Sequence, residues 1–377
     1  MTDFAKAPAR TADYVEFSEG LEHIDPDEEE LITKIVEALH RNNVRAFEKH
    51  QHAIRDAHSK SHGVLGGELT VYPDLEEPLR QGLFAAPATY PVIARLSTTA
   101  GAIRSDQVHG VRGIAIKVLG VAGPRLRPDG HTSHDFIMVN SSFFPFADVR
   151  AYAEKMGFAA LLARTPDTAL RVSGAAFRGI NRIGRPIGRP LRGPAALFAR
   201  PNNNLLGETY HSASPLRYGR YVAKISVWPH SESVKQLTDE PIADDGGHEA
   251  HTELVRDFFA NNSAEYEVRA QLCTDPAVMS IDDATKDWPE ELSPHLRVAK
   301  ITFPKQDACS PARRVFGDDR LSFNSWNGLA AHRPLGGINR LKLRAYAASS
   351  EYRHKMNNVE QSEPTDISEL PGWFPDQ

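Results

Sequence analysis

Short apolar runs bounded by glycine, proline or polar residues recur along the chain and predict β-strands. Most are rich in Val, Ile or Phe, and they cover residues 67–72, 91–97, 113–121, 136–140, 217–228, 266–273 and 298–304. No long helical pattern separates the first four runs, so these strands are most simply antiparallel neighbours, as in a barrel.

A helical pattern precedes the first strand. Residues 25–28 (DPDE) offer an N-cap, a proline at the first helical position and acidic residues in the first turn. An apolar stripe with helical spacing then runs from Leu31 toward Ile54. We expect one long helix here, either continuous or broken at the asparagine pair 42–43. Two shorter helices are expected at 147–156 and 249–260.

A second long helix is predicted within residues 332–357, after two adjacent glycines. Lys342, Tyr346, Ser349 and Arg353 recur at helical spacing and share one face. The tyrosine is either a surface residue among solvated basic side chains or a phenolate that the cations stabilise. Because a free tyrosine has a pKa near ~10, a phenolate at neutral pH needs a positive charge or a metal ion beside it, and ferric haem is one such metal.

Composition narrows the class of protein. The 377 residues include 44 Lys+Arg and 49 Asp+Glu, and the net charge of −5 does not favour nucleic acid as a partner. Cys273 and Cys309 are far apart and have no metal-ligand spacing, which argues against a disulfide framework and against zinc. The N-terminus has no signal-peptide pattern and no run is long enough to cross a bilayer, so we expect a soluble cytoplasmic protein.

Three ordered blocks, together with the tyrosine helix, resemble the haem catalase superfamily. The blocks are Arg55, His58, Lys60, Gly63 and Gly66, then residues 94–98 (ARLST), then residues 112–117 (RGIAIK). The resemblance implies an α+β fold, namely a catalase-like antiparallel eight-stranded β-barrel with surrounding helices. It also implies haem b (iron protoporphyrin IX) as the cofactor and Tyr346 as the metal ligand. Tyr352 is the rival ligand, but Ala348 lies four residues before it.

By the same resemblance, His58 is the base that moves a proton between the peroxide oxygens, a role that suits imidazole because its pKa lies near neutrality. Ser97 would hold the ring nitrogen that faces away from the iron, and Asn140 would donate to a bound peroxide oxygen. The expected cofactor-binding residues are Arg55, Arg95 and Arg353 at the haem propionates, with Lys342 and Phe146 nearby. Each residue also has an ordinary structural interpretation. His58 could cap the end of a helix, Asn140 could form a turn at the end of a strand, and the arginines could form surface salt bridges.

The resemblance covers residues 25–358, which we expect to form the haem domain, between an N-terminal arm (1–24) and a C-terminal tail (359–377). Within it, residues 164–200 hold eight arginines and one acidic residue, Asp167. This segment is either a solvated helical excursion with an irregular linker, or a basic and apolar surface. Such a surface would receive an amphiphilic anion, a membrane surface or a second copy in a homo-oligomer.

Three departures from the catalase pattern bear on activity. Lys342 replaces an arginine, the motif around Asn140 is loosened, and Ala57 replaces the valine before the distal histidine. They favour the branch of small catalase-related peroxidases, so we expect a haem peroxidase that acts on organic hydroperoxides with a small-molecule reductant and has weak or no catalase activity. The alternatives are a fatty acid hydroperoxide dehydratase, isomerase or lyase similar to the catalase-related allene oxide synthases, and a haem-binding protein without turnover.

Overall fold

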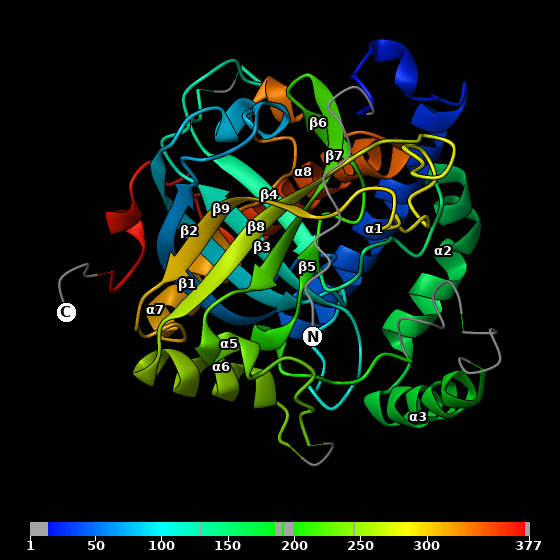
Figure 1. The fold of residues 1–377 in the computed structure, drawn as a ribbon. Helices are drawn as coiled ribbons and strands as arrows, with labels where there is room; N and C mark the ends of the chain where they lie inside the picture. Colours follow the sequence, from blue (N-terminus) through cyan, green and yellow to red (C-terminus); the bar gives the residue numbers. More distant parts are fainter. Residues whose placement is uncertain (1–13, 129, 185–190, 192–198, 244–245, 374–377) are drawn as a thin grey trace.

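The computed structural model describes residues 14–128, 130–184, 191, 199–243 and 246–373. Its strands are β1 (Lys60–Val71), β2 (Thr89–Thr98), β3 (Arg112–Val118), β4 (His134–Val139), β5 (Tyr210–His211), β6 (Leu216–Tyr218), β7 (Tyr221–Pro229), β8 (Ala264–Leu272) and β9 (Leu296–Phe303). They form one antiparallel sheet in the order β5-β4-β3-β2-β1-β9-β8-β7-β6 (Figure 1). β5 also pairs with β7, which closes eight strands into a barrel. The predicted catalase-like eight-stranded barrel is therefore confirmed.

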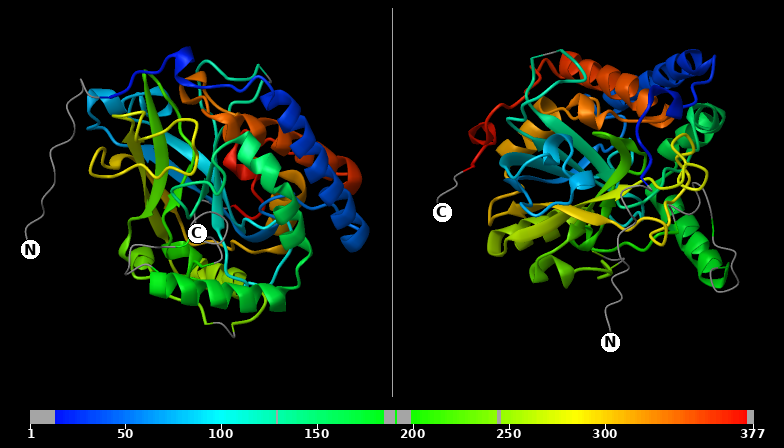
Figure 2. Two further views of the ribbon diagram at one scale, coloured as in Figure 1. Left: turned by 90° about the vertical axis from the view of Figure 1, so that its right-hand side faces the viewer. Right: turned by 45° about the horizontal axis from the view of Figure 1, so that its top comes forward.

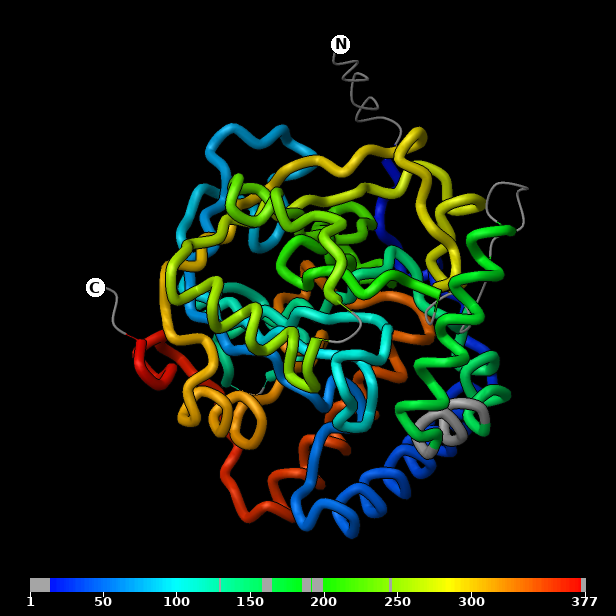
Figure 3. Tube along the Cα trace, turned by 90° about the horizontal axis from the view of Figure 1, so that it is seen from below, coloured from blue at the N-terminus to red at the C-terminus, as the bar shows by residue number. Residues whose placement is uncertain are grey.

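Helices surround the barrel. They are α1 (Glu28–His50), α2 (Val149–Arg164), α3 (Asp167–Gly184), α5 (Glu232–Lys235), α6 (Ala250–Asn261), α7 (Pro311–Val315) and α8 (Gly337–Asn357). α1 and α8 lie side by side outside the barrel, and α2 packs against them (Figure 2). An apolar cluster joins these three helices, formed by Ile32, Ile35, Val149, Leu341 and Ala345. In the view from below, α1 runs along the outer edge of the molecule (Figure 3).

Strand alternation separates the barrel interior from its outer face, because successive side chains point to opposite faces of a strand. On β2, Ala94 and Leu96 belong to the apolar core inside the barrel. Arg95 and Ser97 therefore face outward, on the side where α8 covers the barrel, and both line a cavity there. The candidate site thus lies between the barrel wall and the helices.

Several element boundaries differ from the prediction. β1 begins at Lys60 rather than at 67, and β5, which has two residues, was not predicted. The predicted strand 217–228 is a hairpin of β6 and β7, with its turn at Gly219 in the left-handed conformation (φ 60°). α1 begins at Glu28 and runs unbroken through residues 42–43 to His50. His58 consequently lies in a loop after the helix and not at its end.

Residues of the predicted N-terminal arm (1–24) and of the predicted C-terminal tail (359–377) contact the barrel. The Tyr14 ring contacts Tyr221 edge-on at 5.9 Å, and Glu363 forms an ion pair with Lys117 at 2.6 Å. The expected domain limits stay a prediction. In the segments described, no helix has both the length and the apolar character needed to cross a bilayer.

Candidate active site

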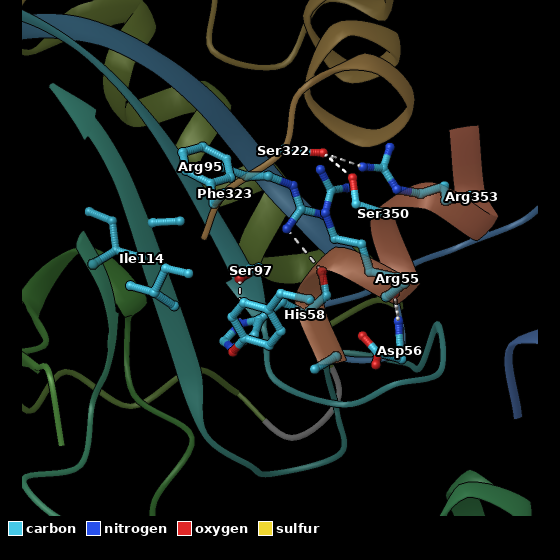
Figure 4. A pocket seen from close by; sticks show the side chains of 15 residues that line it. Arg55, Asp56, His58, Arg95, Ser97, Ile114, Ser322, Phe323, Ser350 and Arg353 are labelled. Atoms are coloured by element: carbon cyan, nitrogen blue, oxygen red, sulfur yellow. Dashed lines mark hydrogen bonds between the residues drawn. The ribbon is translucent and has the colours of Figure 1, made fainter. Parts of the chain in front are cut away.

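His58 lies in the loop between α1 and β1 with a left-handed backbone (φ 57°). Its amide donates to the carbonyl of Thr99 (3.1 Å), and its own carbonyl accepts from Arg95 Nη1 (2.9 Å). The ring Nδ1 lies 2.9 Å from Ser97 Oγ, which lies 3.5 Å from the carbonyl oxygen of Gly113 (Figure 4). Backbone and ring are thus both held by β2, β3 and the loop after β2, so the imidazole has one defined position.

These contacts favour one tautomer and one charge state of His58. The Ser97 hydroxyl donates to a backbone carbonyl of β3, so its oxygen can accept from the Nδ1–H of the ring. Nε2 then carries the free lone pair. Burial, followed by the positive charges of Arg95, Lys342 and Arg55, lowers the pKa of His58 to about 3. The ring is therefore neutral at physiological pH, and its pKa lies well below the near-neutral value that the role of a base was expected to use.

Three arginines from different elements meet at one end of the site (Figure 4). Arg55 and Arg353 both donate to backbone carbonyls of the π-helical turn Phe316–Arg320 and of Leu321, which follows it. Arg95 pairs with the carboxylate of Asp318 in the same turn, at 2.7 Å. Arg95 and Arg353 are each only 2% exposed, so these are not ordinary surface salt bridges. Asp318 also lies 3.7 Å from Arg55, and the charge of Asp319 acts on both Arg55 and Arg353. Three guanidinium groups beside two carboxylates leave a net positive charge, which is suited to a further acidic group.

Tyr346 on α8 lines the same cavity as His58. Burial raises the pKa of the phenol, and Asp56 and Tyr152 raise it further. The hypothesis that neighbouring cations hold this tyrosine as a phenolate is therefore wrong, because the described side chains favour the neutral phenol. Deprotonation needs a positive charge from outside the protein, and a metal ion bound to the phenol oxygen would supply it.

Lys342 and Arg353 share the helical face of Tyr346 but contact other groups. The Lys342 ammonium lies 3.3 Å from Asn339 Oδ1 and 5.6 Å from the centre of the Phe144 ring, and burial lowers its pKa to about 8. Arg353 is directed to the turn at 316–321. Spacing along α8 correctly predicted a shared face, but it did not predict the partners of these side chains.

Two adjoining cavities form the site. A small one of about 60 Å³ is lined by Arg55, Arg95, Ser97 and Arg353, among others. A larger one of about 570 Å³ extends between α1, α2, α8 and the loop after β4. The two cavities share lining residues, namely Asp56, Ala57, His58, Ile137 and Tyr346. Phe146 and Lys342, both predicted to bind the cofactor, line the larger cavity.

Asn140 and Tyr352 are placed away from these cavities. The Asn140 side-chain oxygen accepts from the backbone amide of Arg112 (2.9 Å), and its side chain also hydrogen-bonds to Glu208. Tyr352 packs edge-on against His40, with 4.9 Å between the ring centres. The peroxide-binding role of Asn140 stays a prediction, and in this structure its amide is engaged elsewhere.

Three residues of the site were not singled out from the sequence. Asp318 pairs with Arg95, and Gly113 leaves room for the imidazole. Asp56 lines both cavities with His58 and Tyr346, and burial raises its pKa to about 6. Gly113 lies inside block 112–117, which carries the catalase resemblance. The sequence therefore included this glycine but did not show why a glycine is needed there. No sequence signal distinguishes the two aspartates.

The residues present fit a flat cofactor with a central metal and acidic groups along one edge. Tyr346 could ligate the metal, His58 lines the same space, and Arg55, Arg95 and Arg353 would bind the acidic groups. Apolar residues line the remaining wall, among them Ile137, Phe144, Phe146, Ile338 and Leu341. Within the described ranges, no group of three or more His, Cys, Asp or Glu side chains is placed to hold a metal ion.

This fold is that of the catalases. Catalase A from Saccharomyces cerevisiae matches with a TM-score of 0.58 and 16% identity, over 96% of this chain and 71% of the yeast chain. A fungal and a bacterial catalase each match with a TM-score of 0.56, at 14% and 15% identity, over 98% of this chain and 70% and 68% of theirs. Neither a protein-family model nor a curated protein matches the chain. At these identities the similarity establishes the fold class.

Proposed function

We propose that the protein is a haem b-dependent peroxidase of the small catalase-related kind, which acts on organic hydroperoxides and has weak or no catalase activity. One observation carries the proposal. The smaller cavity is lined by His58, Tyr346 and three clustered arginines, which come from distant parts of the chain. A cytoplasmic location and a small-molecule reductant are part of the same proposal.

Each residue has a distinct role in this proposal. Tyr346 would ligate the iron, and Arg55, Arg95 and Arg353 would bind the propionates bidentately. Bound haem supplies the redox chemistry that cleaves an oxygen–oxygen bond. His58 Nε2 takes the hydroperoxide proton and returns it to the departing oxygen, because its Nδ1 is occupied by the serine hydroxyl.

The larger cavity supports organic hydroperoxides over hydrogen peroxide. Its volume of about 570 Å³ is in the range of pockets that enclose organic ligands. Aromatic and aliphatic side chains make up much of the wall of this cavity, including Phe143, Phe144, Phe146, Tyr152 and Met156. The Asn140 side chain also hydrogen-bonds to the Glu208 carboxylate, which occupies one donor that a small polar peroxide would need.

Stopped-flow kinetics of the haem-loaded protein test the proposal. Cumene hydroperoxide and a linoleate hydroperoxide should react faster than hydrogen peroxide. His58→Ala should keep its haem but lose ~10²–10⁴-fold in rate, as expected for removal of a general base. Tyr346→Phe should lose haem, whereas the matched Tyr352→Phe should not. A wild type that cannot bind haem, or a His58→Ala variant with unchanged rates, would refute the assignment.

The apolar cavity also supports a second candidate, a fatty acid hydroperoxide dehydratase, isomerase or lyase. Both activities need the same base and the same pocket, but they differ in electron balance. A peroxidase forms the alcohol only when a reductant supplies two electrons. A dehydratase or lyase forms an epoxide, ketol or aldehyde without any reductant. Product analysis with and without a reductant therefore decides between them.

We also propose that α3 contacts an anionic membrane surface. Its outward face carries Val172, Ile180 and Ile183, which are 73%, 54% and 73% exposed. Arg171 and Arg178 lie on the same helix, which forms part of the arginine-rich segment and lies at the edge of the molecule (Figure 1). These two arginines lie on the other side of the helix, where they line a cavity with Gln107 and His109. The exposed apolar face itself is suited to the boundary of lipid headgroups. A contact between two copies of the chain is the alternative use of this face.

A further inference from the structure

A separate cavity of about 30 Å³ lies between β4, the loop before β6 and α8. Much of its wall is apolar, with Phe136, Met138 and Leu216 among the lining residues. It adjoins the larger cavity of the candidate site, because Lys342 lines both. A water-sized ligand needs about 10–15 Å³ of such space, so this cavity has room for one or two small ligands and for no organic molecule.

Two hydroxyl groups at this cavity have no hydrogen-bond partner in the described part of the chain. Ser214 Oγ and Ser325 Oγ are both buried and unpaired, and both residues line the cavity. Buried polar side chains are normally paired. These two hydroxyls are therefore available to a molecule or ion bound in the cavity.

Lys342 adds a positive charge that no carboxylate balances. Among the described residues its ammonium forms no ion pair, and it hydrogen-bonds to Asn339 Oδ1 at 3.3 Å. Burial lowers its pKa to about 8, and no acidic group opposes that shift. The acidic residue of the cavity wall, Asp135, directs both carboxylate oxygens to Lys117, at 2.8 and 3.1 Å. Because a buried charge without a counter-charge is unfavourable, an anion is favoured beside Lys342.

Asn339 on α8 brings the three donors around one space. Its side-chain oxygen accepts from Lys342, and its side-chain nitrogen donates to the carbonyl of the residue after Ser214 (3.0 Å). Its backbone carbonyl accepts from the indole nitrogen of the residue after Ser325 (2.7 Å). The ammonium and the two hydroxyls therefore approach the cavity from three different segments of the chain.

We propose that this cavity binds a halide ion, chloride in the cell, through the Lys342 ammonium and the hydroxyls of Ser214 and Ser325. The ammonium balances the charge of the ion, and each hydroxyl donates one hydrogen bond to it. Because every donor belongs to the protein, the site does not depend on the proposed peroxidase activity. The bound ion offsets part of the positive charge that Lys342 exerts on His58.

Crystals of the haem-loaded protein grown in sodium bromide test the site directly, because anomalous scattering distinguishes bromide from water. The anomalous difference map should show a bromide ion in contact with Lys342, Ser214 and Ser325. Water density without an anomalous signal at these residues would overturn the inference, and so would bromide found only at the iron or at the protein surface.

Thermal unfolding of the same protein measures affinity and specificity. At equal ionic strength, sodium chloride should raise the melting temperature above its value in sodium gluconate, whose anion is too large for the cavity. At about 100 times the dissociation constant, the rise for a chain of this length is ~3 °C. The same melting temperature in both salts would contradict the site.

Substitutions connect this response to the named donors. Ser214→Ala/Ser325→Ala should weaken chloride binding ~100-fold, because each hydrogen bond to a charged group contributes ~10-fold in affinity. Lys342→Met should abolish the response. Ser293→Ala is the matched control, since it removes another buried and unpaired hydroxyl that does not line the cavity. It should respond like the wild type, and an undiminished response of the double serine variant would overturn the inference.

Discussion

Gly113→Ala is the sharpest test of how the barrel positions the base. Gly113 lies on β3 opposite Ser97, and a Cβ atom at this position would be 2.6 Å from His58 Nδ1 and closer still to Cε1. Carbon atoms in normal contact are ~3.5–4.0 Å apart. The methyl group and the ring therefore overlap by roughly 1 Å, and the imidazole must move by about that distance.

The displacement should cost activity and leave the fold intact. A movement of this size breaks the 2.9 Å contact between Ser97 and Nδ1 and changes the direction of Nε2. Misplacing a catalytic group by about 1 Å costs ~10²-fold in rate, which corresponds to ~2.7 kcal/mol of activation free energy. Position 113 does not have a positive φ, so alanine fits the strand backbone without strain.

The assay compares Gly113→Ala with Gly110→Ala, because nothing lies within 4 Å of a Cβ added at Gly110. Both proteins should bind haem and melt near the wild-type temperature in circular dichroism. Stopped-flow reaction with cumene hydroperoxide should be ~10²-fold slower for Gly113→Ala alone. If the folded, haem-loaded Gly113→Ala protein reacts at the wild-type rate, the position of the imidazole does not limit the chemistry and the argument fails.

Three further predictions concern pH, the arginine cluster and α3. Because the pKa of His58 is lowered to about 3, the rate of reaction with a hydroperoxide should show no inflection near pH ~6.5. The free energy of unfolding should decrease as pH falls from ~6.5 toward 3, because the unfolded chain then binds a proton that the folded His58 does not. A kinetic titration near pH ~6.5 would contradict this. Asp318→Asn should leave Arg95 without its carboxylate and cost roughly 1–3 kcal/mol in urea unfolding; an unchanged midpoint would argue against the pair. Val172→Glu with Ile183→Glu should abolish flotation with anionic vesicles without slowing reaction with cumene hydroperoxide, and retained flotation would exclude this face.

The barrel was predictable because the local pattern of apolar and polar residues indicates most of its strands. β2 and β3 are apolar runs with clear boundaries, and β8 alternates polar and apolar residues. The antiparallel pairing of β1 to β4 follows from the absence of a long helix between them. The start of β1 is different, since residues 60–66 contain polar residues and glycines without alternation. Their strand conformation depends on close neighbours: a Cβ at Gly66 would collide with Trp373, far away in the sequence. Local propensity contains no information about that contact.

The site was predictable where residues lie on regular elements. Arg95 and Ser97 share a face of β2 because they are two residues apart, and Tyr346 shares a face of α8 with Arg353. The environment of Tyr346 was not predictable, because the carboxyl of Asp56 approaches it from a loop at the other end of the chain. The direction of Asn140 likewise depends on the backbone amide of a neighbouring strand.

His58 itself shows how the fold maintains a conformation that its sequence does not favour. A non-glycine residue with a left-handed backbone costs roughly 1–3 kcal/mol and persists only where surrounding contacts determine it. Here Thr99 accepts from its amide, Arg95 donates to its carbonyl and Ser97 holds its ring. Arg95 also pairs with Asp318, so the group that fixes the histidine backbone belongs to the cluster expected to bind the acidic edge of the cofactor. Cofactor binding and the position of the base therefore depend on the same guanidinium group, and a substitution of Arg95 should impair both at once.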